Sequence, residues 1–141
     1  MKINKQRKIV FVNGCFDILH PGHIHLLKNA KNKGDYLFVG LNSDKSIKAL
    51  KGKDRPFFSQ IERKKMLLEL KSVDEVGIFS DLNALKLLKK IKPDIYVKGS
   101  DYLGKRTPET DYMIFENKKI FYVKLLKKYS TSKIFSEIKS L

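Results

Sequence analysis

Two histidines stand three residues apart in the segment 13–23, which reads NGCFDILHPGH. An apolar run at 8–12 precedes the segment and is typical of a buried strand, while the apolar residues of 24–30 recur at helical spacing. Pro21 fits the first turn of that helix, because its missing N–H would be unpaired there. Both histidines are therefore expected at a helix start, where free N–H groups and the helix dipole favour an anion such as phosphate.

Other interpretations of the histidine pair remain open at this point. Two ordinary surface histidines would give the same pattern, although the preceding strand and Gly14, which allows close backbone approach, favour a phosphate site. A zinc site is disfavoured because no third and fourth ligand stand out, and His25 should lie on another helix face. The single cysteine, Cys15, excludes an internal disulfide and fits a reducing compartment.

The composition predicts one globular domain, 1–141, with 42% hydrophobic and 32% charged residues. No apolar run approaches the roughly 18 residues of a membrane span, and the basic start is a poor signal peptide, so we expect a cytoplasmic protein. The formal net charge is +15, but only four of the 30 basic residues are arginine. Because the lysines are spread over the whole chain, we expect them on solvent-exposed helix faces rather than in one surface that binds nucleic acid. A basic surface also attracts nucleoside triphosphates.

Strand patterns alternate with helix patterns along the whole chain. The predicted strands are 8–12, 36–41, 73–79, 95–97 and 120–123, and the predicted helices are 21–33, 43–50, 59–70, 81–91, 109–116 and one that Ser130 or Thr131 caps. This alternation predicts an α/β fold, a Rossmann-like doubly wound, five-stranded parallel sheet with helices on both faces. Ligands bind such sheets at the carboxyl ends of the strands, where we expect the polar segments 13–23, 42–55, 98–102 and 127–132 to converge.

The segment 14–23 resembles the signature of the HxGH nucleotidyltransferase superfamily, in its cytidylyltransferase-like branch, and the resemblance covers essentially the whole chain. Further segments most resemble the D-glycero-β-D-manno-heptose 1-phosphate adenylyltransferases, namely 42–52, Arg55-Pro56, Glu62-Arg63 and 97–102. That group transfers AMP from ATP to a sugar 1-phosphate and releases pyrophosphate, for precursors of surface polysaccharides. Two alternatives are cytidylyl transfer to glycerol phosphate or another polyol phosphate, and a non-catalytic basic domain that binds nucleotides or nucleic acid.

Near the C-terminus the chain departs from the family pattern. Lys128 replaces the usual Gly before the Ser-Thr-Ser run at 130–132, which leaves the shape of that loop open. Leu125 stands where the cytidylyltransferases often have Arg, which favours the heptose group.

The resemblance also implies roles for individual residues. The catalytic residues would be His20, His23, Lys51 and Arg63. The nucleotide would bind Asn13, Gly14, Cys15, Phe16, Gly22, Lys48, Lys98, Gly99, Asp101, Ser130, Thr131 and Ser132. Asp17 and Arg63 would bind the acceptor, Arg63 by gripping its phosphate, unless Arg63 forms a surface ion pair and Asp17 only orients an imidazole or satisfies the turn.

The implied partners are a nucleoside triphosphate, with ATP favoured and CTP the alternative, and a sugar or polyol phosphate. Mg²⁺ would arrive with the triphosphate and be held mostly by phosphate and water, so no metal-binding side chains are assigned. We expect no membrane, no specific nucleic acid and a homodimer. Related systems fuse a sugar kinase domain to this one, and because these residues contain no kinase pattern, a separate enzyme would supply the acceptor.

Overall fold

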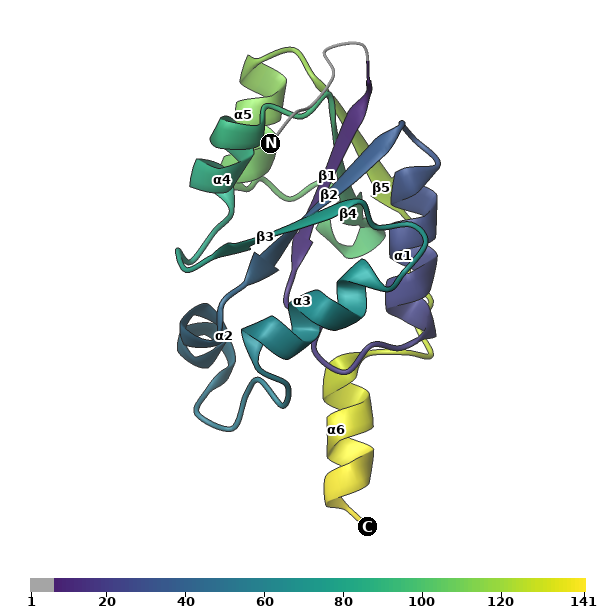
Figure 1. Cartoon of the computed structure of the whole chain (residues 1–141), viewed down its shortest axis with the longest axis vertical. Helices are drawn as coiled ribbons and strands as arrows, with labels where there is room; N and C mark the ends of the chain where they lie inside the picture. The colour runs from purple at the N-terminus through teal and green to yellow at the C-terminus, as the bar shows by residue number, and fades with distance from the viewer. Residues whose placement is uncertain (1–6) are drawn as a thin grey trace.

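The computed structural model describes residues 7–141 and builds them around one parallel sheet (Figure 1). The strands are β1 (Ile9–Gly14), β2 (Tyr36–Asn42), β3 (Glu75–Phe79), β4 (Ile95–Gly99) and β5 (Lys119–Val123). The helices are α1 (Pro21–Lys31), α2 (Asp44–Lys51), α3 (Gln60–Leu68), α4 (Leu85–Ile91), α5 (Pro108–Phe115) and α6 (Thr131–Lys139), with a 3₁₀ turn η1 (Ser100–Tyr102). The strand order β3-β2-β1-β4-β5, parallel throughout, confirms the predicted doubly wound sheet.

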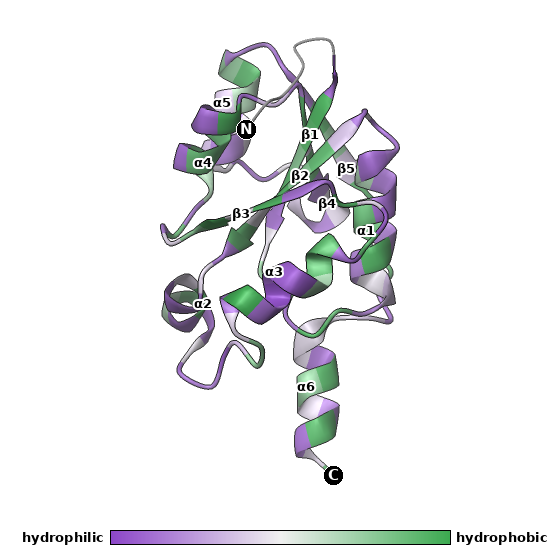
Figure 2. Cartoon of the chain, viewed as in Figure 1, coloured by the Kyte–Doolittle hydropathy of each residue, from purple (hydrophilic) through white to green (hydrophobic). Residues whose placement is uncertain are grey.

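Alternating side chains place a hydrophobic core on each face of the sheet. In β1, Val10 and Val12 pack on the side covered by α1 and α3, whereas Phe11 packs on the side covered by α4 and α5. The same alternation runs through β2 and β4, because successive side chains of a strand point to opposite faces. Figure 2 shows the result as hydrophobic strands between helices of mixed hydropathy. Burial on both faces explains why these strands read as continuous apolar runs.

The strand order reverses between β1 and β4, and this point opens a crevice. Over the described residues, β1 pairs with β2 along its whole length but with β4 only at Val10–Ile95 and Phe11–Tyr96. The carboxyl ends of β1 and β4 are therefore not joined to each other by ladder hydrogen bonds. In open α/β sheets such a switch point is where ligands bind.

The predicted start of the helix after β3 is wrong. Asp81 does not cap it, because α4 begins only at Leu85, where the Asn83 side chain accepts the Leu85 N–H at 3.1 Å. Instead the Asp81 carbonyl accepts a hydrogen bond from Ser46 of α2, and Leu82 is 66% exposed. The segment before α4 thus closes against α2 rather than forming a helical turn.

The last helix, α6, extends away from the sheet and is anchored at its N-terminal end (Figure 1). Ser130 caps it as predicted, by accepting the Lys133 N–H at 3.0 Å. The Thr131 hydroxyl donates to the Asp17 carbonyl at 2.6 Å, which ties the helix start to the turn after β1. None of the helices described between residues 7 and 141 is long and apolar enough to cross a membrane.

Candidate active site

A cavity of about 560 Å³ lies at the carboxyl ends of β1 and β4, next to a smaller one of about 250 Å³. The predicted residues that line the larger cavity are Asn13, Gly14, Cys15, Phe16, His23, Lys51, Lys98, Gly99, Asp101 and Thr131. Those that line the smaller cavity are His20, Gly22, His23, Lys51, Ser130, Thr131 and Ser132. All four polar segments expected at this edge contribute to the lining, as predicted.

The two histidines begin α1 and are fixed by backbone hydrogen bonds. His20 Nδ1 accepts the N–H of Gly22 at 3.0 Å, and His23 Nδ1 accepts the N–H of His20 at 3.3 Å, so the pair forms a capping box. The two rings stack with their centroids 3.7 Å apart. Because each Nδ1 is an acceptor, each neutral imidazole carries its proton on Nε2. The helix start therefore holds two Nε2–H donors in fixed orientations.

Gly22 is required for this arrangement. A Cβ at position 22 would lie 2.8 Å from Cε1 of the His20 ring, closer than packed atoms approach. The glycine between the histidines thus lets His20 fold back onto the helix start.

Burial keeps both imidazoles uncharged in the free protein. Desolvation, followed by the electrostatic effects of the neighbouring His20 ring and the Lys51 ammonium, lowers the pKa of His23 to about 3. Desolvation also lowers the pKa of His20. The expectation that a bound triphosphate favours the protonated forms concerns the complex and remains a prediction.

The depressed pKa of His23 predicts a pH dependence of stability. Between about pH 6.5 and pH 3 the unfolded chain binds a proton at His23 that the folded chain does not, so the free energy of unfolding falls as the pH falls through this window. Urea unfolding at pH 7 and pH 4.5 should show a smaller loss for His23→Gln than for the wild type. Equal losses, or an NMR titration of His23 near pH 6.5, would contradict this environment.

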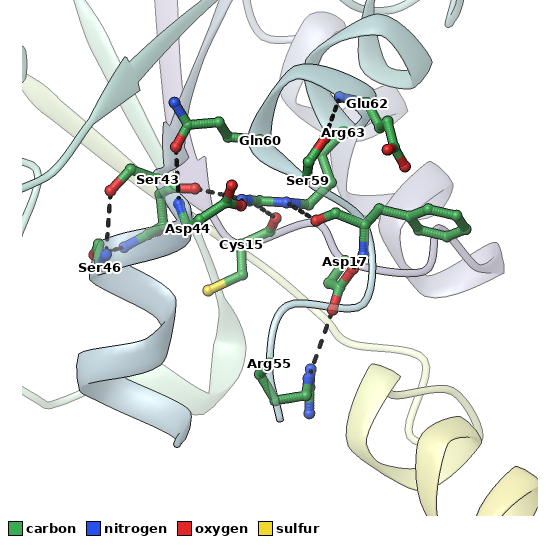
Figure 3. A network of polar contacts seen from close by, with 12 residues as sticks. Cys15, Asp17, Ser43, Asp44, Ser46, Arg55, Ser59, Gln60, Glu62 and Arg63 are labelled. Atoms are coloured by element: carbon green, nitrogen blue, oxygen red, sulfur yellow. Dashed lines mark hydrogen bonds and ion pairs between the residues drawn. The ribbon is translucent and has the colours of Figure 1, made fainter. Parts of the chain in front are cut away.

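Asp17 is buried, and both of its carboxylate oxygens interact with the loop after α2 (Figure 3). It accepts the backbone N–H groups of Phe57 at 2.7 Å and Phe58 at 3.0 Å, and it pairs with Arg55 at 3.5 Å. With 1% of its surface exposed, Asp17 is not placed to bind the acceptor directly, and that prediction is corrected. Satisfying a turn and fixing the neighbouring loop is the role that the structure gives it.

Arg63 is also corrected, because its side chain is fully buried, with 0% of its surface exposed. Its guanidinium donates to the carbonyl oxygens of Phe58, Cys15 and Asn42 at 2.7–2.9 Å and to the Asp44 carboxylate at 2.8 Å (Figure 3). It neither lines the cavity nor forms the alternative surface ion pair. Arg63 instead joins the turns after β1 and β2 to the start of α3.

The lysine assigned to catalysis, Lys51, and the two assigned to the nucleotide, Lys48 and Lys98, lie in different places. Lys51 lines both cavities, whereas Lys48 is exposed and lines neither. Lys98 is buried at the end of β4, donates to the Tyr96 hydroxyl at 3.1 Å and lies 3.9 Å from the centre of the Tyr102 ring. Burial lowers the pKa of Lys98. Of these three lysines, only Lys51 and Lys98 line a cavity at the carboxyl ends of the strands.

The cytidylyltransferase-like family model matches residues 11–137 of the chain. The chain belongs to the cytidylyltransferase-like family. The predicted resemblance to this family is therefore confirmed over nearly the whole sequence.

Curated relatives are similar to this chain over a part of their length. The chain is 46% identical over 134 residues to the bifunctional protein HldE of Helicobacter pylori strain P12, covering 95% of this chain and 28% of the relative. It is 44% identical over 140 residues to bifunctional protein HldE of Campylobacter fetus subsp. fetus, covering 99% of this chain and 30% of the relative. The chain thus spans less than a third of these relatives.

Solved structures share the fold of this cytidylyltransferase-like chain. A lipopolysaccharide core biosynthesis protein from Thermoplasma volcanium matches with a TM-score of 0.68 and 33% identity, covering 83% of this chain and 97% of that one. Pantoate-beta-alanine ligase from Francisella tularensis matches with a TM-score of 0.60 and 20% identity, covering 94% of this chain and 69% of that one. The second likeness shows the fold alone.

Two charged residues of the cavity, Arg55 and Glu109, were not assigned from the sequence. Both are buried, and both have side-chain atoms without a hydrogen-bond partner among residues 7–141, namely Nε and Nη2 of Arg55 and Oε1 of Glu109. In the sequence, the only feature that marks Arg55 is the Arg55-Pro56 pair in a polar loop. Glu109 reads as a surface carboxylate that favours a helix N-terminus, so the sequence carries no signal that it is buried.

Proposed function

We propose that this chain transfers AMP from ATP to D-glycero-D-manno-heptose 1-phosphate and releases pyrophosphate. The observation that carries the proposal is the stacked pair of imidazoles, fixed as Nε2–H donors beside Lys51, at a cavity that reaches the N-terminus of α6. The name of one similar structure, a lipopolysaccharide core biosynthesis protein, supports a sugar phosphate as acceptor. A homodimer, which rests on the family resemblance, and a cytoplasmic location, which rests on the composition of the chain, belong to the same proposal.

In this reaction an oxygen of the acceptor phosphate forms a bond to the α-phosphorus of ATP. The bond from the α-phosphorus to the bridging oxygen breaks, and pyrophosphate leaves with the electron pair. The attacking phosphate is already ionised, so the chain needs no nucleophile and no general base of its own. His20, His23 and Lys51 stabilise the negative charge on the non-bridging and leaving oxygens.

The N-terminus of α6 provides the other end of the triphosphate site. Backbone N–H groups of a first helical turn lack partners within the helix and favour an anion. Ser130 and Ser132 line the smaller cavity and can donate through their hydroxyl groups. The Thr131 hydroxyl already donates its hydrogen to the Asp17 carbonyl, so Thr131 serves through its backbone and by anchoring the helix.

Magnesium fits this site as a companion of the triphosphate. The part of the chain that the structure describes has no group of three His, Cys, Asp or Glu side chains placed to hold a metal ion. The cavity lining instead offers the cations Lys51, Lys98 and Arg55, which suit a phosphate-rich ligand. Mg²⁺ bound to the phosphates would supply additional charge neutralisation, held mainly by phosphate oxygens and water.

A pyrophosphate-release screen tests the proposal. Each of the four nucleoside triphosphates is combined with Mg²⁺ and with heptose 1-phosphate, glycerol 3-phosphate or other sugar phosphates. We expect release with ATP and heptose 1-phosphate. Release only with CTP and glycerol phosphate would favour the cytidylyl alternative, and no release, with DNA or RNA binding that weakens steeply with salt, would favour a nucleic-acid-binding domain.

A further inference from the structure

Tyr96 is a fully buried residue of β4 whose hydroxyl group links two residues of the cavity wall. Its ring packs against Phe11 on the face of the sheet that α4 and α5 cover. The Lys98 ammonium donates to the Tyr96 hydroxyl at 3.1 Å, and the Tyr96 hydroxyl donates to Oδ1 of Asn13. Lys98 and Asn13 both line the larger cavity. A side chain that is itself buried thus connects two groups that a ligand could meet.

This hydrogen-bond network crosses the switch point of the sheet. Among the described residues, the ladder between β1 and β4 reaches the pair Phe11–Tyr96 and goes no further toward the carboxyl ends. Asn13 lies two residues beyond Phe11, and Lys98 lies two residues beyond Tyr96, so both side chains project from the same face as that pair. The Tyr96 hydroxyl therefore joins the two strands at the point where their backbone hydrogen bonds end.

The direction of each hydrogen bond in the network is fixed. An ammonium group only donates, so the Tyr96 oxygen accepts from Lys98 and directs its own hydrogen to Asn13. Burial raises the pKa of Tyr96 above its usual range, so the hydroxyl keeps this hydrogen at neutral pH. The amide oxygen of Asn13 is thus held toward Tyr96, which turns the amide nitrogen, Nδ2, away from it.

Nδ2 of Asn13 is the free end of the network. Within the range 7–141 it donates to no protein group, and it does not belong to the unpaired side-chain atoms that are closed to solvent. The Asn13 side chain is half-buried and lines the larger cavity. Nδ2 is therefore an accessible donor of two N–H groups, oriented by a bond on the other side of the amide.

The donors at this point of the cavity suit a phosphate group. Nδ2 of Asn13 and the Lys98 ammonium donate hydrogen bonds and accept none, so they match the ionised oxygens of a phosphate. His23 and Lys51, to which the proposed reaction gives phosphate oxygens, line the same cavity. Both substrates carry such a group, ATP in its triphosphate and the acceptor in its sugar phosphate.

We propose that Tyr96 is a positioning residue, whose hydroxyl group holds the Asn13 amide with Nδ2 toward a substrate phosphate in the larger cavity. Tyr96 does not touch the substrate and acts through Asn13. Without the hydroxyl group the amide can turn over and present its oxygen, which repels a phosphate. This inference rests on the proposed function, because the phosphate belongs to one of its two substrates.

Steady-state kinetics of Tyr96→Phe test this role, with Tyr112→Phe as the matched control. A neutral hydrogen bond corresponds to roughly a three- to tenfold change in binding, so we expect Tyr96→Phe to raise one KM by about that factor. A rise for ATP assigns the phosphate to the triphosphate, and a rise for heptose 1-phosphate assigns it to the acceptor. Tyr112 packs against the same core and lines neither cavity, so Tyr112→Phe should match the wild type in both constants.

A double-mutant cycle with Asn13→Ala separates positioning from a structural effect. Asn13→Ala removes the donor itself and should raise the same KM roughly ten- to hundredfold, since a phosphate is a charged partner. If Tyr96 acts through Asn13, its hydroxyl has nothing to orient in the absence of the amide. The double variant should therefore lie within about twofold of Asn13→Ala, whereas independent effects would multiply.

Three outcomes would overturn the inference. The first is an unchanged KM for both substrates in Tyr96→Phe, and the second is an effect of Tyr96→Phe that multiplies with that of Asn13→Ala. The third is a normal KM for both substrates in Asn13→Asp, which keeps the shape of the amide but replaces Nδ2 with an oxygen. A thermal melt of each variant sets a temperature at which all of them are folded.

Failure of the proposed function is distinguishable from failure of this inference. If the wild type releases no pyrophosphate with any nucleotide, the proposed function fails. Isothermal titration of ATP with Mg²⁺ and, separately, of heptose 1-phosphate into the wild type, Tyr96→Phe and Asn13→Ala then decides the role of Tyr96. Weaker binding of one ligand by both variants supports it, whereas equal binding by Tyr96→Phe, or no binding of either ligand by the wild type, refutes it.

Discussion

Replacing His23 with alanine should lower kcat for pyrophosphate release by about 10²–10³-fold, and His20→Ala should do the same. Removing one preorganised donor to a developing oxyanion typically costs this much, because the donor acts in a site from which water is excluded. His23 lies where the two cavities meet, and its Nδ1 bond to the His20 backbone fixes the Nε2–H. Initial rates at saturating substrates, with circular dichroism to confirm folding, measure the effect.

His25→Ala is the matched control for the two histidine variants. His25 belongs to the same helix, but its Nε2 is hydrogen-bonded to the Lys124 carbonyl and it lines neither cavity. Its kcat should stay within about twofold of the wild type. Near-normal turnover by both His20→Ala and His23→Ala would show that the imidazoles do not stabilise the transition state.

Replacing Arg63 with methionine should destabilise the whole fold rather than weaken substrate binding alone. The change removes the guanidinium donor from three carbonyl oxygens, of which the bond to Asn42 is fully buried, and it removes the partner of the Asp44 carboxylate. Leaving a buried acceptor without its donor typically costs about 1–3 kcal/mol, so the loss of these bonds together is expected to cost about 3 kcal/mol or more, while the Asp44 carboxylate, 35% exposed, adds little. For a chain of this size that loss lowers Tm by roughly 10 °C or more, which differential scanning calorimetry measures directly.

Lys65→Met, on the exposed side of the same helix, should leave Tm within a few degrees of the wild type. Arg63→Lys should recover only part of the stability, since one ammonium cannot reproduce the planar fork of donors. If Arg63 instead gripped the acceptor phosphate, Arg63→Met would keep the wild-type Tm and raise only the KM for the acceptor. That pattern would contradict the role of Arg63 as a buried support of the fold.

The fold was predictable because its signals are local. The apolar run at 8–12 and the helical spacing after Pro21 each reflect burial along one element, and alternation of such elements leaves few topologies. The histidine pair was found for the same reason, since a strand, a glycine turn and a helix start are all visible within one short segment.

The roles of Arg63 and Asp17 and the burial of Glu109 depend on contacts between distant segments. Arg63 bonds to residues 48 and 21 positions away, and Asp17 to residues 40 and 41 positions away. A charged residue near a helix start reads as exposed, because burial of a charge is costly and its compensating partners are invisible in the sequence. The structure therefore turns two expected substrate ligands into supports of the site and adds Glu109 to its wall.

The proposed transfer is tested most directly by the fate of the α-phosphate. The wild type is incubated with ATP labelled at the α-phosphorus, heptose 1-phosphate and Mg²⁺, and the products are separated and identified by mass. We predict that the label enters a nucleotide sugar and that one pyrophosphate forms per labelled product, with both lost together in His23→Ala. Label that stays in ATP or in free AMP, with no nucleotide sugar formed by the folded wild type, would contradict the proposed function.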